Sequence, residues 1–138
     1  MTEIARIVKM VKAAYDGDAW HGPNIKSVLE KVDAKNKDAR VGHGHSIIEL
    51  VGHMAAWRKF VIEQLNGNKD FKVTDEMNFP ALTDWNAALQ TLEHTQIQLI
   101  NVLGRLAEES LGDQVASRKY SRYTLLHGIV HHDLYHLG

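Results

Sequence analysis

The sequence has no cysteine, only two prolines and no long apolar run. Without cysteine, the chain cannot form disulfides, thiolate nucleophiles or Cys-type zinc sites, so histidine and the carboxylates are the only strong metal ligands left. No apolar run approaches the length that spans a bilayer, and the N-terminus is charged within its first six residues. We therefore expect a soluble, cytoplasmic protein in which nitrogen and oxygen atoms bind any metal.

An excess of charge of one sign is also missing. Lysine and arginine number 16 against 17 acidic residues, and no basic run occurs. A near-neutral chain gives no electrostatic reason to expect nucleic acid or an anionic membrane as a partner. At 138 residues, the chain has the size of one ordinary domain, and we expect residues 1–138 to form a single one.

Four stretches carry apolar residues at the three-to-four spacing of an amphipathic helix. Their ends are marked by N-cap residues and by glycines, and at Ser46 the glutamate three residues on, Glu49, predicts a capping box. The expected first residues are Thr2, Ser46, Thr83 or Asp84, and Ser121, and the predicted helices span residues 2–16, 46–66, 83–111 and 121–138. A short extra helix is expected from Pro23 or Asn24 to Val32. No stretch alternates like a strand, so we predict an all-α fold, an antiparallel-type four-helix bundle with one short extra helix after the first.

The segment 68–82 shows no sustained period. A connection of this length inside a compact domain is often functional. We interpret it as a lid.

The last fourteen residues hold four of the nine histidines, arranged as two pairs with a spacing of four. Residues four apart on a helix lie one above the other, so each pair could present two imidazoles to one point. On a helical wheel, His132 and His136 share the sector of the apolar residues Leu125 and Ile129. The rival pair lies at the edge of that face, with Thr124, Gly128 and Tyr135; it consists of His127 and His131.

A further histidine lies on an apolar face of the second long helix. On the wheel of residues 46–66, His53 falls among five apolar neighbours, Leu50, Met54, Trp57, Phe60 and Val61. His53 is therefore expected to face inward. If both helices turn these faces to the interior, His53, His132 and His136 converge.

Three imidazoles are the ligand count of an open, catalytic-type metal site, in which one position remains for water or substrate. Imidazole ligands suit zinc, nickel, iron and cobalt, of which we expect zinc or nickel first. Asp133 or Glu49 could approach as a fourth ligand or as a proton acceptor. The alternative is a core histidine at position 53 that donates to a carbonyl, with the C-terminal histidines at a frayed helix end.

The remaining candidates have no stacked partner. His43, His45 and His94 are expected on the surface. The tryptophans are interpreted as core fillers, any of which could line one wall of a pocket; they are Trp20, Trp57 and Trp85.

Three motifs occur in order along the chain: Trp20-His-Gly-Pro23, then Ser46-Ile-Ile-Glu-Leu-Val-Gly-His-Met-Ala-Ala-Trp57, then Leu126-His-Gly-Ile-Val-His-His-Asp-Leu-Tyr-His-Leu-Gly138. Together they resemble the DinB-like family of metal-dependent proteins. The resemblance covers nearly the whole chain and implies a four-helix bundle. It also implies that a His of the second helix and a His-x-x-x-His of the last helix surround a divalent metal. In the family the last motif usually continues through Gly-Gln, whereas this sequence stops at Gly138.

By position, the family's ligands correspond to His53, His132 and His136, the same three that the wheels select. Relatives include thiol-dependent transferases and isomerases and proteins called hydrolases. Our leading hypothesis is an enzyme in which the metal activates a water or a thiol, with Glu49 or Asp133 as the proton acceptor. We expect as partners a small-molecule substrate, a small thiol cosubstrate and a second copy of the chain in a homodimer. The competing hypothesis is a non-catalytic bundle that binds a metal or apolar ligand, or dimerises.

Overall fold

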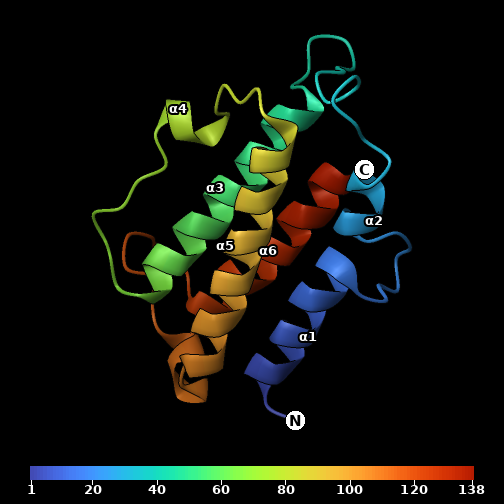
Figure 1. Ribbon diagram of the computed structural model, residues 1–138. Helices are drawn as coiled ribbons and strands as arrows, with labels where there is room; N and C mark the ends of the chain where they lie inside the picture. Colours follow the sequence, from blue (N-terminus) through green and yellow to red (C-terminus); the bar gives the residue numbers. More distant parts are fainter.

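The computed structural model describes all 138 residues, and the chain is all-α. Figure 1 shows its helices, which are α1 (Glu3–Asp16), α2 (Ile25–Leu29), α3 (Ile47–Leu65), α4 (Asp75–Asn78), α5 (Trp85–Arg105), the short 3₁₀ helix η1 (Glu108–Gly112) and α6 (Arg122–Leu137). None of them combines the length and the apolar character that crossing a membrane requires.

The predicted N-caps are confirmed. At the start of each long helix, an oxygen of the capping side chain accepts a hydrogen bond from the backbone N–H three residues on; the caps are Thr2, Ser46, Asp84 and Ser121. These side chains satisfy backbone donors that have no partner inside the helix. The polar residues that precede each apolar stripe therefore determine where the helices begin.

The helix ends differ from the prediction in three places. The short second helix ends at Leu29 rather than Val32, and the segment 68–82 contains the helical turn α4. The predicted helix 83–111 ends at Arg105, because the chain extends at Leu106 and only then forms η1. This break places the carboxylate of Glu108 against the start of α1, where it accepts hydrogen bonds from two backbone N–H groups at 2.7 and 3.2 Å. An acidic group at a helix N-terminus is stabilising.

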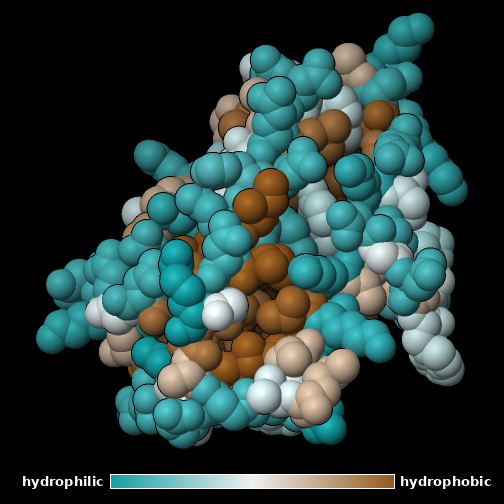
Figure 2. Space-filling model, turned by 60° about the horizontal axis from the view of Figure 1, so that its bottom comes forward, coloured by the Kyte–Doolittle hydropathy of each residue, from teal (hydrophilic) through white to brown (hydrophobic).

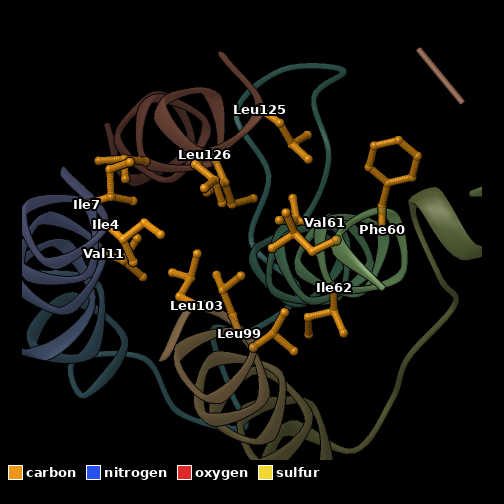
Figure 3. Close-up of a cluster of buried hydrophobic side chains, with 14 of the residues drawn as sticks. Ile4, Ile7, Val11, Phe60, Val61, Ile62, Leu99, Leu103, Leu125 and Leu126 are labelled. Carbon is orange, nitrogen blue, oxygen red and sulfur yellow. The ribbon is translucent and has the colours of Figure 1, made fainter. Parts of the chain in front are cut away.

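The four long helices α1, α3, α5 and α6 surround a common core. In Figure 3 the labelled side chains converge from four directions; they include Ile7 of α1, Val61 of α3, Leu103 of α5 and Leu126 of α6. A second, smaller apolar cluster consists of side chains from the end of α1, from α2 and from the N-terminal halves of α3 and α5. Figure 2 shows hydrophobic atoms lining a hollow on the lower face, so water reaches part of the apolar surface there.

A buried polar network crosses the centre of this core. Arg58 of α3 is fully buried, and its guanidinium donates two hydrogen bonds of 2.7 Å to the two carboxylate oxygens of Asp133 on α6. The third guanidinium nitrogen, Nε, donates to Oε1 of Gln96 on α5 at 3.1 Å. Gln96 in turn donates to the carbonyl of Val11 on α1 at 3.5 Å. One set of side chains thus connects all four long helices, and no sequence pattern predicted it.

Candidate metal centre

The structure brings His53 of α3 together with His132 and His136 of α6. One ring nitrogen of each lies within 4.8 Å of those of the other two, and the three ring centroids are 4.5–4.9 Å apart. The spacing of four on α6 stacks two of the rings, and contact between α3 and α6 supplies the third. Three imidazoles so placed could hold one metal ion.

Hydrogen bonding indicates which nitrogens are free. Nδ1 of His53 lies 2.9 Å from the backbone carbonyl of Asn78, and because a carbonyl only accepts, we assign the hydrogen of this ring to Nδ1. Nε2 of His53 then carries no hydrogen, and it faces Nε2 of His132 at 3.0 Å. Nδ1 of His132 is buried without any partner. The facing pair suits a metal ion, because the two Nε2 atoms share at most one hydrogen and, without it, both direct lone pairs at the space between them.

The three imidazoles are held in the neutral form that metal binding requires. Burial lowers the pKa of His53 and of His136 below their ordinary range. For His132, burial, followed by the positive charge that His136 and His53 carry when protonated, lowers the pKa to about 4. At neutral pH the cluster therefore offers lone pairs rather than positive charges.

The end of α4 holds His53 in place. Besides the carbonyl that accepts from His53, Asn78 offers its side-chain oxygen to the indole N–H of Trp57 at 2.9 Å. The next residue, Phe79, stacks its ring between those of His53 and His45, with centroid distances of 4.2 and 3.5 Å. The segment that we interpreted as a lid from sequence thus lies directly on the histidine cluster.

Gly52 allows this close approach. A Cβ atom at position 52 would lie 2.6 Å from Cγ of Pro80 and 2.9 Å from Cδ1 of Leu82, closer than real Cβ contacts come. Glycine in the middle of a helix is unfavourable, so its presence beside His53 signals a backbone that packs tightly. That signal was available in the sequence, but nothing in the sequence indicated Pro80 and Leu82 as the residues that pack against Gly52.

The two candidate carboxylates lie outside the histidine cluster. Glu49 binds Arg40 and His45, and these hydrogen bonds, that of Arg40 first, lower its pKa to about 2. His45, which binds Glu49, stacks on Phe79, and Phe79 stacks on His53. Both oxygens of Asp133 accept from Arg58, and although burial raises the pKa of Asp133, the guanidinium opposes this rise. The catalytic roles of the two carboxylates stay predictions.

The rival histidine pair does not enter the cluster. His131 is exposed, and His127 packs against the ring of Tyr123, with its Nε2 3.9 Å from a carboxylate oxygen of Glu3. Among the tryptophans, Trp85 is buried and Trp57 is half-buried beside the cluster. The interpretation of Trp20 as a core filler is wrong, because its side chain is fully exposed in the turn after α1.

Comparison with known proteins identifies a family. The family model described as the DinB superfamily matches residues 13–138. The match spans the end of α1 and all of α2 to α6, and so includes the three clustered histidines. Neither the curated proteins nor the solved structures gave a match.

Proposed function

Because the chain belongs to the DinB superfamily, we propose that His53, His132 and His136 bind one divalent metal ion and that the protein is a metal-dependent enzyme acting on a small molecule. The observation that carries the proposal is the convergence of three ring nitrogens within 4.8 Å, with no other protein ligand in the group. We infer that the four long helices form the four-helix bundle of this family. Zinc and nickel are the ions that we expect first, and iron and cobalt also suit imidazole ligands.

Three imidazoles leave part of a metal's coordination sphere for other ligands, and an ion so bound supplies a Lewis acid that makes a neighbouring water or thiol more acidic. The carbonyl of Asn78 orients the ring of His53 and keeps its Nε2 bare. Burial keeps protons off the three rings near neutral pH. A carboxylate with a pKa of about 2 is a weak base, and Asp133 is occupied by Arg58, so the proposal gives the proton-acceptor role to neither.

A metal assay is the first test. Protein purified without a nickel column should bind about one equivalent of Zn, Ni, Co or Fe after reloading, because the structure has one such cluster. Because binding to the native state stabilises it, removal of the metal by a chelator should lower the melting temperature. Binding of clearly less than one equivalent after reloading would overturn the proposal.

A cobalt spectrum then separates an open site from a closed one. Azide and a small thiol should each shift the visible absorption of the cobalt-loaded protein, because a ligand that enters the coordination sphere changes its geometry. A saturable shift with the thiol at neutral pH supports a thiol-dependent transferase, whereas a shift with azide alone supports a hydrolase. In His53→Ala both shifts should disappear.

The non-catalytic alternative has its own outcome in this experiment. If a loaded protein responds to no small ligand, the site is closed, and the protein is a metal-binding bundle without an enzymatic role. Association into a homodimer, measured by sedimentation with and without metal, is then the function to test.

A further inference from the structure

A pocket of about 240 Å³ lies between α3 and α6, and His132 of the candidate metal centre forms part of its wall. The position of this pocket next to the histidines follows from the spacing of its lining residues in the sequence. Trp57 lies four residues after His53 on α3, and Gly128 lies four residues before His132 on α6, so each is one turn away from a histidine on the same helix face. The pocket is therefore a continuation of the histidine cluster along the groove between the two helices.

The lining of this pocket is apolar and carries no charge. Its walls are mainly side chains of the two helices, including Phe60, Val61, Leu125 and Ile129. Besides Trp57 and His132, the lining residues with polar side-chain atoms are Tyr120 and Thr124. A charged ligand group would lose its hydration there without an ionic partner among the lining residues; the nearest cation that the structure shows is Arg118, over the ring of Phe60 at 5.0 Å.

Gly128 contributes to the pocket lining without a side chain. This glycine lies in the interior of α6, where it weakens the helix, and a Cβ atom built on it would meet no other atom within 4 Å. Since Gly128 lines the pocket, a side chain at position 128 would begin in open space rather than clash with a neighbour. Gly52 is different, because there the neighbouring chain fills the space.

We propose that this pocket binds an uncharged apolar part of the substrate, a single aromatic ring or a short alkyl chain, while the polar reacting group of the substrate lies at the three histidines. The part of this inference that places the reacting group at the histidines rests on the proposed function. The size is suitable, since a cavity of about 150 Å³ accepts a benzene ring. A pocket of about 240 Å³ accommodates a ring together with a short linker.

The first experiment compares two hydroxamates that share one metal-binding head, acetohydroxamate and phenylacetohydroxamate, on cobalt-loaded protein. Burial of the ring should make the phenyl compound bind about tenfold more tightly or better. Gly128→Met fills the pocket and should remove this advantage, while the affinity for acetohydroxamate stays within about twofold. The matched control is Gly104→Met, at an exposed position of α5 with equally open space, which should keep the advantage. Equal binding of the two hydroxamates, or an advantage that survives in Gly128→Met, would overturn the inference.

The second experiment needs no metal. In chelated, ¹⁵N-labelled protein, benzyl alcohol should shift the indole signal of Trp57, assigned with Trp57→Phe, and leave that of the exposed Trp20 in place. In Gly128→Met the shift should be lost. If the protein binds no metal, this arm alone decides: a shift confined to Trp57 supports the pocket although the proposed function has failed, and no shift up to the solubility limit overturns the pocket. A protein that binds metal but shows neither effect refutes the pocket and leaves the proposed function standing.

Discussion

Two buried polar clusters join α3 to α6, and they differ in how completely their atoms are paired. In the first, every nitrogen of the Arg58 guanidinium and both oxygens of Asp133 have partners. In the second, the Nε2 atoms of His53 and His132 face each other and Nδ1 of His132 has no partner. His132 and Asp133 are neighbours in sequence, yet they belong to different clusters because successive residues point about 100° apart on a helix.

The difference agrees with a structural role for the first cluster and with the metal binding that we propose for the second. A fully paired buried network specifies how helices pack, and nothing needs to be added to it. In the second cluster, the facing Nε2 atoms of His53 and His132 share at most one hydrogen, and without it both can bind one ion. We therefore infer that the first cluster stabilises the arrangement of α1, α3, α5 and α6, while the second is the one that we propose to bind a metal ion.

Breaking the paired cluster should have the largest effect on stability. Asp133→Ala leaves the Arg58 guanidinium buried and uncompensated, and we expect the free energy of unfolding of chelated protein to fall by about 3–5 kcal/mol. Urea denaturation followed by circular dichroism measures the loss. A decrease below about 1 kcal/mol would mean that the pair does not hold the helices together.

The matched control removes both charges at once. Because replacing a buried ion pair with apolar side chains is often neutral or stabilising, the double variant Arg58→Met/Asp133→Leu should recover most of the stability lost in Asp133→Ala. If the double variant is as unstable as the sum of the single variants, packing rather than pairing explains the first result.

Breaking the histidine cluster should mainly affect metal affinity. Replacement of His53, His132 or His136 by alanine removes one proposed ligand and should weaken zinc binding by at least about 100-fold. The loss should exceed the effect of removing a group that only hydrogen-bonds to a ligand, which is about 10–100-fold. Stability without metal should change less than in Asp133→Ala. Isothermal titration with zinc gives the affinity, and the exposed His131 supplies the control, His131→Ala, which should bind normally. The assignment of ligands is wrong if His127→Ala/His131→Ala abolishes binding and His132→Ala does not.

The sequence predicted the parts of this molecule that follow from local periodicity. The N-caps at Ser46 and Ser121 and the inward faces of His53, His132 and His136 depend on spacing within single helices, and the structure has them. The end of α5 was predicted too far along, because the apolar stripe continues past Arg105 while Glu108 bonds to the start of α1. Such a contact depends on the fold and not on a local pattern.

The partners of the histidines could not be predicted for the same reason. Asn78 acts through its backbone carbonyl, which every residue has, and Arg58 looked like an ordinary charged helix residue next to the exposed Lys59. Trp20 was misplaced because hydrophobicity alone suggested burial. Only Gly52 carried a local signal, a glycine inside a helix, that pointed to a close neighbour.

Gly52→Ala tests whether the end of α4 positions His53. The added methyl group must displace Pro80 and Leu82, and the hydrogen bond from His53 to Asn78 should weaken with them. We expect zinc affinity to fall by about 10–100-fold, as for the loss of an outer partner of a metal-ligating histidine. The control is Gly104→Ala, where open space surrounds the added methyl group and affinity should not change. Full zinc affinity in Gly52→Ala would show that the segment does not orient the ring.

The smallest effect that we expect is the pH dependence of stability without metal. The pKa values of His53, His132 and His136 lie below their ordinary value of about 6.5 in the folded state, that of His132 at about 4. Between pH 6.5 and 4 the unfolded chain therefore binds protons that the folded chain does not, so stability is complete above about pH 6.5 and falls as the pH falls toward 4.

Urea titrations of metal-free protein at several pH values from 7 to 4.5 measure this slope. In His132→Leu one of the three groups is missing, and the slope should become shallower. Glu49, whose folded pKa of about 2 lies below its ordinary value, adds to the slope near pH 4.5 in both proteins alike. Asp133 titrates in both proteins, so the difference between the two slopes reports on position 132. An equal slope in the two proteins would show that His132 is not held neutral by its burial, and the contrast between the paired and the unpaired cluster would then rest on geometry alone.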